Sequence, residues 1–321
     1  MLNGAIVGFG NVAQFGHWPA YLDSADARII GIVDASAERR AAAAAIAPAV
    51  PTFASLPLLN RELQIDFIDI CTPPVQHAEQ LLQGIDFGYA IICEKPIVTN
   101  LAALEQIAER SAAANTPVIP VHNWKYAPII RRATELVESG AIGELRSVEI
   151  ETLRTRDAAQ ADSTTPSWRR SAAAAGGGIV MDHGWHAIYL ALNWFREAPR
   201  EVTAKLHQPS GAEVETEAAL SIAFASGVAK IFLSWNATER RNRVILRGER
   251  GQISIDDDLL TVAGDTTRFG QKLSGGSHHP DWFASMLPHA IAAFRQPARA
   301  RQLFEEAATC LRVVRRAYEQ C

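Results

Sequence analysis

A glycine-rich turn near the amino terminus constrains the fold of this 321-residue chain more than any other feature. The β-branched run Ala5–Val7 is typical of a parallel strand that is buried on both faces. In the turn Gly8–Ala13 that follows, Gly8 permits a tight bend and Gly10 lets the backbone approach a pyrophosphate. The small Ala13 allows the next helix to pack closely. The pattern predicts a strand, a turn and a helix whose first N–H groups bind phosphates.

A second apolar run, residues 29–33, predicts the next strand, and Asp34 stands at its end. That position suits a carboxylate that accepts hydrogen bonds from the ribose of a dinucleotide. Because a carboxylate repels a 2′-phosphate, NAD is favoured over NADP. NADP stays open, since Ser36, Arg39 and Arg40 could hold a 2′-phosphate if Asp34 turned aside. These three residues also suit a helix cap and two solvated helix arginines.

Length and composition limit the class of protein. A chain of 321 residues suits two domains, and 48% hydrophobic with 21% charged residues is typical of a soluble globular protein. The net charge of −4 argues against a nucleic-acid partner. Without a basic apolar leader or a long apolar run, we expect no signal peptide, no membrane span and no membrane partner. Four widely spaced cysteines argue against zinc and disulfides and predict reduced thiols in the cytoplasm: Cys71, Cys93, Cys310 and Cys321.

Polar turns follow two further predicted strands of this first domain. Thr72–His77 follows a strand at 68–71, and Glu94–Pro96 follows a strand at 90–93. Ligands of open α/β sheets bind beyond the carboxyl ends of the strands, so both turns should border the cofactor. Lys95 would lie near the nicotinamide, where its ammonium can donate to a substrate oxygen.

Other interpretations of these residues remain open. Lys95 by default is a surface lysine, and Pro96 constrains it and allows a cis peptide bond between the two. The double proline after Thr72 can also be no more than a rigid turn. For His17, in the crossover after the glycine turn, packing is favoured over contact with the cofactor.

The pattern changes at residue 122 and predicts a second domain over 122–321, after a Rossmann-type α/β domain over 1–121. Its β-rich runs predict one large, mainly antiparallel sheet with one face under helices and the other available to a partner subunit. A long loop is expected over Arg156–Ser171, and the last helix is expected to pack back toward the first domain. The runs are 145–154, 200–207, 216–225, 228–235, 243–248, 252–255 and 259–262, and the last two helices are expected at 283–293 and 300–318.

The segment Gly176–His186 is the second concentrated signal. Its glycines permit close approach of the backbone, and the helix that follows places Asp182 and His186 four residues apart on one face. A carboxylate and an imidazole so placed make an orienting group and a general base. The alternatives are a helix-surface contact and a pair of metal ligands, although no further residue completes a metal site. His183 is predicted to point to a different face.

Several polar and aromatic residues are candidates for substrate binding. Adjacent histidines before Pro280 could bind a metal or contact a polyol, or they could form the polar entry of a helix. The substrate candidates are Asn123, Trp124, Lys125, Tyr126, Trp168, Arg169, His278 and His279.

Taken together, these motifs resemble the Gfo/Idh/MocA oxidoreductase family over essentially the whole chain. The motifs, in order, are G-F-G-N-V-A at 8–13, T-P-P-x-x-H at 72–77, E-K-P at 94–96, N-x-x-Y-x-P at 123–128, W-R at 168–169 and G-G-G-x-x-x-D-x-G-x-H at 176–186. One departure is Lys125, where many relatives carry arginine.

The resemblance implies a Rossmann domain, an α/β domain with an open sheet, and a homodimer or homotetramer formed across that sheet. It also implies that Lys95, Asp182 and His186 are the catalytic residues. The expected cofactor-binding residues are Gly8, Gly10, Asn11, Val12, Asp34, Thr72, Pro73, His77, Glu94 and Lys95.

These expectations lead to three hypotheses of function. The principal one is an NAD(P)-dependent dehydrogenase that transfers hydride between nicotinamide and a secondary alcohol or ketone of a sugar, cyclitol or related polyol. The second is an NAD-dependent glycosidase in which the cofactor is reduced and regenerated within one cycle. The third is a nucleotide-sensing binding protein, against which the intact lysine, aspartate and histidine argue.

Overall fold

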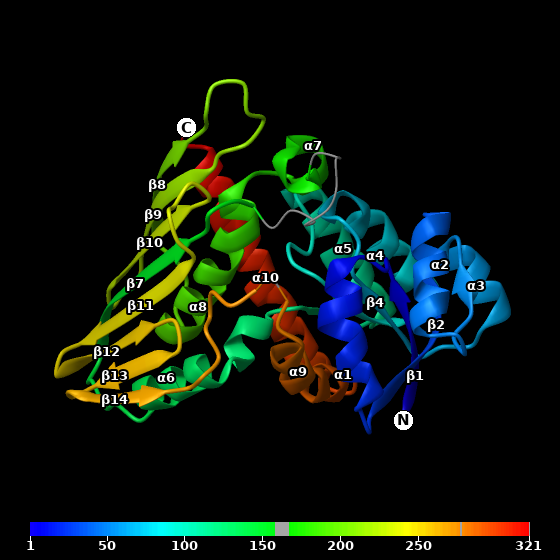
Figure 1. The fold of residues 1–321 in the computed structure, drawn as a ribbon, viewed down its shortest axis with the longest axis horizontal. Coiled ribbons are helices and arrows are strands. Elements are labelled where there is room, and N and C mark those ends of the chain that lie inside the picture. Colours follow the sequence, from blue (N-terminus) through cyan, green and yellow to red (C-terminus); the bar gives the residue numbers. More distant parts are fainter. Residues whose placement is uncertain (158–166, 277, 321) are drawn as a thin grey trace. The chain divides into compact units, whose positions relative to one another are not determined.

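The computed structural model describes residues 1–157, 167–276 and 278–320, so residues 158–166 of the expected loop lie outside the described part. The chain forms two compact units (Figure 1). The first unit contains Met1–Asn123 and His278–Ala308, and the second contains Trp124–Ser277 and Thr309–Cys321. Each unit is therefore built from two separate stretches of the chain.

The first unit contains a six-stranded parallel sheet in the order β3-β2-β1-β4-β5-β6. Apolar runs buried on both faces form its strands, as the sequence predicted. The order changes direction at β1, which pairs with both β2 and β4, and ligands of doubly wound sheets bind at such a switch point. The strands are β1 (Leu2–Val7), β2 (Ala27–Val33), β3 (Thr52–Phe53), β4 (Phe67–Ile70), β5 (Ala90–Cys93) and β6 (Val118–Pro120).

Helices connect these strands, and Ser36 and Asn100 cap two of them by accepting a backbone N–H three residues on. Helix α3 was not predicted, and the helix after the glycine turn begins with one π-helical turn, η1. The elements are η1 (Ala13–His17), α1 (Trp18–Leu22), α2 (Ala37–Ile46), α3 (Leu56–Glu62), η2 (Pro74–Gln76), α4 (His77–Asp86), α5 (Leu101–Ala114) and α9 (Pro280–Ala293). Helix α10 (Pro297–Tyr318) contributes residues to both units.

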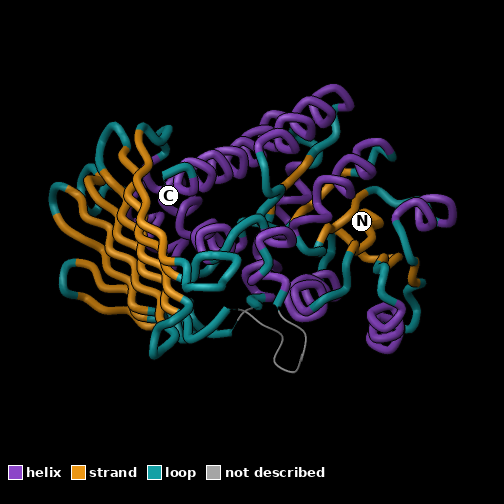
Figure 2. Tube along the Cα trace, turned by 90° about the horizontal axis from the view of Figure 1, so that it is seen from above, coloured by secondary structure: helices purple, strands orange, loops and turns teal. Residues whose placement is uncertain are grey.

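The second unit contains an eight-stranded sheet in the order β14-β13-β12-β11-β7-β10-β9-β8, drawn as a single layer of strands in Figure 2. Among the described strands of this sheet, only the central β7 and β10 pair in parallel, so the predicted mainly antiparallel sheet is confirmed. The predicted runs all became strands, and β14 was missed. The strands are β7 (Leu145–Leu153), β8 (Glu201–His207), β9 (Glu217–Ala223), β10 (Val228–Ser234), β11 (Arg241–Gly248), β12 (Gly251–Asp256), β13 (Leu259–Val262) and β14 (Asp265–Arg268).

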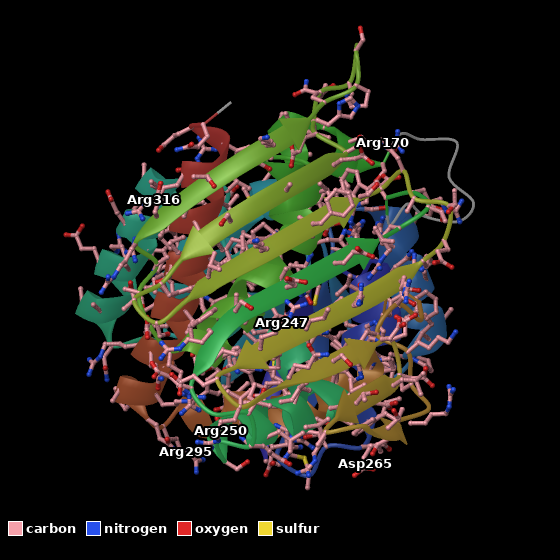
Figure 3. The ribbon with its side chains drawn as sticks, turned by 90° about the vertical axis from the view of Figure 1, so that its left-hand side faces the viewer. Arg170, Arg247, Arg250, Asp265, Arg295 and Arg316 are labelled. Carbon is pink, nitrogen blue, oxygen red and sulfur yellow. The ribbon has the colours of Figure 1, made fainter. Side chains whose placement is uncertain are left out.

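Helices cover one face of this sheet (Figure 1). Alternate residues such as Ile150 and Ile231 are buried, whereas their neighbours Lys230 and Phe232 are exposed, because side chains of a strand alternate between faces. Figure 3 looks onto the sheet, where Arg247 pairs with Glu149 at 2.5 Å. The helical elements are η3 (Asn123–Tyr126), α6 (Pro128–Glu138), η4 (Trp168–Arg170), α7 (Ala172–Ala175), η5 (Val180–Gly184) and α8 (Trp185–Phe195).

Candidate active site

The glycine turn lies at the carboxyl end of β1 and packs closely on the turn after β4. Gly8 has φ +90°, and a Cβ atom there would lie 2.6 Å from Cγ2 of Thr72 and 2.9 Å from its backbone nitrogen. Glycine is therefore required both for the backbone conformation and for the close approach. A Cβ at Gly10 would meet only the tip of the Arg39 side chain. Asn11 and Val12 begin the helical segment that follows.

Asp34 follows β2 and faces the same turn. One carboxylate oxygen accepts the backbone N–H of Phe9 at 2.8 Å, and the other accepts that of Ser36 at 2.9 Å. The acid is thus fixed beside the glycine turn, where a ribose hydroxyl of a dinucleotide is recognised. Arg40 donates to the backbone oxygens of Asp34 and Ala35. The helix-cap role considered for Ser36 is confirmed.

His77 joins the two polar turns that the sequence singled out. Its ring nitrogens lie 2.8 Å from the backbone oxygen of Thr72 and 2.8 Å from that of Pro96. The imidazole is fully buried and bridges these two backbone segments. The Thr72 hydroxyl donates to Gln80 at 2.6 Å. Pro73 precedes η2, and the Lys95–Pro96 peptide bond is cis, as the sequence allowed.

A buried chain of hydrogen bonds lies behind Lys95. The Tyr21 hydroxyl donates to Asp69 at 2.9 Å, and Asp69 lies 2.8 Å from Nδ1 of His17. Nε2 of His17 lies 3.1 Å from Glu94, whose other oxygen accepts the backbone N–H of Lys95 at 3.0 Å. The ring of His17 also stacks on Phe283 with centroids 3.6 Å apart. The favoured packing role of His17 is confirmed, and the residue has hydrogen-bonding partners as well.

The charged groups in this chain of hydrogen bonds stabilise one another. Burial lowers the pKa of His17, but the charge and hydrogen bond of Asp69, together with Cys71, outweigh burial and hold that pKa well above its usual value. Burial likewise favours the neutral form of Glu94, yet the hydrogen bond and charge of His17 and the charge of Lys95 hold the pKa of Glu94 below its usual value. The result is an imidazolium between two carboxylates.

His17, Asp69 and Cys71 also place one nitrogen, one oxygen and one sulfur within 4.8 Å of one another. These atoms are already joined by hydrogen bonds, including one of 3.3 Å between Cys71 Sγ and His17 Nδ1. Burial and the charge of Asp69 raise the pKa of the Cys71 thiol to about 12. Because metals bind the thiolate, the group is better described as a hydrogen-bonded network than as a metal site.

In the second unit, the glycines of the Gly176–His186 segment allow the backbone to pack against Glu215. A Cβ at Gly178 would lie 2.1 Å from the backbone oxygen of Glu215, and a Cβ at Gly177 would lie 2.1 Å from the Tyr318 hydroxyl. The Glu215 carboxylate accepts the backbone N–H groups of Gly178 and Val180 and the hydroxyl of Tyr318. These contacts fix the start of η5, which carries Asp182.

Asp182 lies beside Arg169 and His183. Its Oδ2 is 3.5 Å from Nε of Arg169, which stacks over Trp168 with 4.3 Å between the guanidinium and the ring centroid. The same oxygen is 3.3 Å from Nδ1 of His183, so the expectation that His183 points to a different face was wrong. The π-helical turn over Val180–Gly184 is wider than an α-helical turn and changes the angle between successive side chains.

His186 is the centre of an aromatic group. Its ring stacks on Trp124 with centroids 4.7 Å apart, and its Nδ1 lies 2.9 Å from the Tyr189 hydroxyl. The backbone N–H of Trp124 donates to the same hydroxyl at 3.1 Å. Nζ of Lys125 lies 5.9 Å from the centroid of the Tyr189 ring. Tyr126 shares the short turn η3 with Trp124 and Lys125.

The catalytic and substrate candidates are divided between the two units. The first unit contains Lys95, Asn123, His278 and His279, and the second contains the others. The ring of His278 lies 5.8 Å from that of Phe15. His279 caps α9 and stacks on Trp282, with centroids 3.5 Å apart, and Pro280 begins the helix. The expected helix entry with Pro280 at its start is confirmed, and contact of the histidine pair with a polyol stays a prediction.

Sequence reasoning missed Asp69 and Tyr189. A charged residue within the apolar run Phe67–Cys71 was a signal, because a buried carboxylate needs partners. Tyr189 stands three residues after His186 on the same helix, which is the spacing of neighbouring side chains. His17, which contacts both Asp69 and Glu94, is distant from both in the sequence.

A glycine turn after β1, an acid after β2, and polar turns after β4 and β5 fit a dinucleotide, and the second unit adds an imidazole and a carboxylate. These features define a dinucleotide-dependent oxidoreductase. The chain belongs to the Gfo/Idh/MocA family: residues 2–122 match the oxidoreductase family with an NAD-binding Rossmann fold, and residues 130–254 match the GFO/IDH/MocA C-terminal domain. The enzyme is an NAD(P)-dependent dehydrogenase or reductase, and NAD is its cofactor.

Relatives agree with this assignment, and solved structures share the fold. An oxidoreductase of Formosa agariphila is 27% identical over 265 residues, which are 81% of this chain and 81% of the relative. The D-apiose dehydrogenase of Paraburkholderia graminis is 26% identical over 90% of this chain and 76% of its own length. The aldose-aldose oxidoreductase of Caulobacter crescentus shares the fold, with a TM-score of 0.84 at 19% identity over 99% of this chain and 97% of that structure. No helix within the described residues is long and apolar enough to cross a membrane.

Proposed function

We propose that this enzyme transfers hydride between nicotinamide and a secondary alcohol or ketone of a sugar, cyclitol or related polyol. The arrangement of His186, Trp124 and Tyr189 carries the proposal. An imidazole held by stacking and by a hydroxyl has a fixed orientation, as a general base requires. Relatives named D-apiose dehydrogenase and inositol 2-dehydrogenase support this substrate class. When bound, NAD supplies the hydride acceptor at its nicotinamide ring.

Tyr189 selects the ring nitrogen of His186 that acts as the base. Its hydroxyl oxygen can accept from both the backbone of Trp124 and Nδ1 of His186. With the proton held on Nδ1, Nε2 carries the lone pair and is the nitrogen that takes the substrate hydroxyl proton in this proposal. Stacking on Trp124 holds the ring of His186 nearly parallel to the indole. In the reductive direction the protonated His186 returns the proton from Nε2.

Asp182 and Lys95 have complementary roles in this proposal. The Trp235 indole donates to Nδ1 of His183 at 3.1 Å, and the same nitrogen lies 3.3 Å from Oδ2 of Asp182. The carboxylate of Asp182 orients a substrate hydroxyl or the imidazole of His186. The ammonium of Lys95, whose backbone is fixed by Glu94, stabilises the negative charge that develops on the substrate oxygen.

The test replaces Lys95 with methionine, with Lys272→Met as a control for the loss of an exposed lysine. Reduced-nicotinamide absorbance is followed across a panel of polyols, and NAD binding is measured by calorimetry. We expect Lys95→Met to lower kcat by at least about a hundredfold, because it removes charge stabilisation from the transition state, with nearly unchanged NAD affinity. Unchanged turnover in Lys95→Met would refute the assignment of the lysine.

The same assay separates the dehydrogenase from the glycosidase hypothesis. Stoichiometric formation of reduced nicotinamide with a polyol supports the dehydrogenase. Release of a free sugar from a glycoside without net absorbance change would support cleavage with internal regeneration of the cofactor.

We also propose that NAD is preferred over NADP, because Asp34 is held beside the glycine turn. Asp34→Ala should reduce the ratio of kcat/KM for NAD to kcat/KM for NADP by at least about tenfold.

We further propose that the exposed face of the eight-stranded sheet forms a homo-oligomer. Phe232 in β10 is 44% exposed in the single chain and is surrounded by charged residues of both signs, including Glu149 and Lys230. A large apolar side chain among paired charges is typical of an interface that is polar at its rim. Light scattering after chromatography should give a dimer or tetramer for the wild type and smaller particles for Phe232→Lys. A wild-type monomer would contradict the proposal.

A further inference from the structure

An arginine cluster in the second unit is formed by Arg154, Arg156 and Arg240. Within the described part of the chain it has no carboxylate among its hydrogen-bond partners. Arg154 follows β7 and is only 2% exposed. Its Nη1 donates to the backbone oxygen of Leu153 at 2.7 Å, to that of Arg241 at 3.4 Å, and to Asn242 Oδ1 at 3.1 Å. All three acceptors are neutral, although a buried guanidinium normally lies against an acid.

Two buried donors of this region have no acceptor among the described residues. Nε of Arg154 and Nδ2 of Asn242 both lack a hydrogen-bond partner. The two side chains are joined through Nη1 and Oδ1, so the unsatisfied donors belong to neighbouring groups. Leaving a buried donor unsatisfied costs about 1–3 kcal/mol, and more when the group is charged. Unpaired donors beside a buried charge indicate a site whose acceptor the described residues do not supply.

Asp257, the carboxylate whose charge raises the pKa of Arg154 most, is engaged elsewhere. It accepts the backbone N–H of Asn242 at 3.0 Å and both the N–H and the hydroxyl of Ser274 at 3.1 and 2.8 Å. Arg240 donates to the backbone oxygens of Ser274 and Gly276, so it lies next to this group without bonding the acid. Asp257 therefore offsets the cluster only at a distance.

The electrostatic consequence is that the arginines destabilise one another's charged forms. Burial, and then the charge of Arg240, lower the pKa of Arg154 to about 10, against the opposing charges of Asp257 and Asp182. Burial, and then the charge of Arg156, lower the pKa of Arg240 as well. The members of the cluster thus repel one another, and an anion bound among them would relieve that repulsion.

The cluster lies beside the candidate catalytic residues of the same unit. The backbone N–H of Arg154 donates to Ser234, and the next residue, Trp235, donates its indole N–H to His183. His183 is in contact with Asp182, whose charge acts on Arg154. A group bound by the arginine cluster would therefore lie close to a substrate held by Asp182.

We propose that the arginine cluster binds an anionic group of the substrate, a carboxylate or a phosphate, so that the natural substrate is an acidic sugar or polyol. The inference rests on the proposed reaction, because it assigns the charge of that reaction's substrate. Arg156 is exposed, Arg240 is partly exposed and Arg154 is buried, so the cluster leads from solvent to the interior. The outer arginines and the unsatisfied donors of Arg154 and Asn242 contact the anion, and the charge of Arg154 acts where water screens it least.

Binding of a simple anion tests the cluster without turnover. Thermal unfolding is followed during titration with inorganic phosphate and with acetate, at constant ionic strength made up with chloride. We expect stabilisation of the wild type and a dissociation constant about ten- to hundredfold higher in Arg240→Gln, the range for one charge-assisted hydrogen bond. Arg250→Gln, at the other end of β11, is the control and should bind as the wild type does. Arg156→Gln provides a second, exposed variant should Arg240→Gln fail to fold.

Kinetics with matched substrates complete the test. Glucose, glucuronate and glucose 6-phosphate, and the corresponding forms of other polyols, are compared by kcat/KM in the wild type and in Arg240→Gln. A preference for one acidic form that disappears in the variant supports the inference, and the preferred form distinguishes carboxylate from phosphate. Equal use of neutral and acidic forms overturns it and leaves the proposed reaction intact. Anion binding that depends on Arg240, without turnover of any polyol, supports the anion site and counts against the reaction.

Discussion

The buried carboxylate of Asp69 allows a quantitative test of how the first unit is held together. It is 0% exposed and lies 2.8 Å from His17 and 2.9 Å from the Tyr21 hydroxyl. Asp69→Asn preserves the shape and one acceptor oxygen but removes the charge that stabilises the imidazolium. Removing one partner of a buried ion pair costs about 3–5 kcal/mol. Because Glu94 remains as a second partner of His17, we expect a loss of about 3 kcal/mol in the free energy of unfolding.

The measurement is urea unfolding followed by circular dichroism, with Asp66→Asn as the matched control. Asp66 precedes the same strand and accepts one backbone N–H, that of Asn3, at 2.7 Å, but it is exposed. We expect its replacement to cost less than about 1 kcal/mol. Equal losses in the two variants would refute the view that the charge of Asp69 is needed inside the unit.

Asp69→Asn also has a catalytic readout. If the network orients Glu94, and through it the backbone of Lys95, then kcat should fall in folded Asp69→Asn by about tenfold while KM for NAD changes little. A rise in the KM for NAD with constant kcat would show instead that the network supports the cofactor turn.

Three further predictions concern other parts of the site. The folded pKa of His17 is raised, so its stabilising contribution is complete below about pH 6.5 and is lost as the pH rises through the folded pKa. The difference in unfolding free energy between wild type and His17→Gln should therefore be larger at about pH 6 than at about pH 10, and a constant difference would contradict this. Tyr189→Phe keeps the packing around His186 but removes the acceptor of its Nδ1 proton, and kcat should fall by about tenfold or more in a polyol assay, with normal NAD binding by calorimetry. Gly8→Ala places a methyl group against Thr72 at φ +90°, and calorimetry should show at least about tenfold weaker NAD binding, whereas unchanged affinity would contradict the close-approach argument.

The strands and their ends could be predicted from the sequence because their signals are local. Apolar runs closed by Gly8, Asp34, Thr72 and Glu94 gave both the parallel sheet and the residues at its carboxyl edge. The antiparallel sheet was predictable for the same reason, apart from β14. That strand, Asp265–Arg268, is fully exposed and short, so it has no apolar alternation to identify it.

The side-chain partners could not be predicted, because they depend on long-range packing and on the helix type. An α-helical period relates Asp182 to His186, but the π-helical turn brings His183 to Asp182. The link from His17 to Asp69 and Glu94 joins three separate segments, and no spacing in the sequence encodes it. Such contacts become visible only when the chain is folded.

The two units differ in how a buried positive charge is compensated, and this difference bears on function. In the first unit, the charge of His17 lies between two carboxylates, so its burial is compensated and the backbone of Lys95 is held in place. In the second unit, Arg154 is equally buried but bonds only neutral oxygens. Uncompensated burial costs several kcal/mol per ion, which a fold retains where an external partner supplies the opposite charge. A paired charge therefore indicates a rigid support, and the unpaired charge of Arg154 indicates a place where an anion binds.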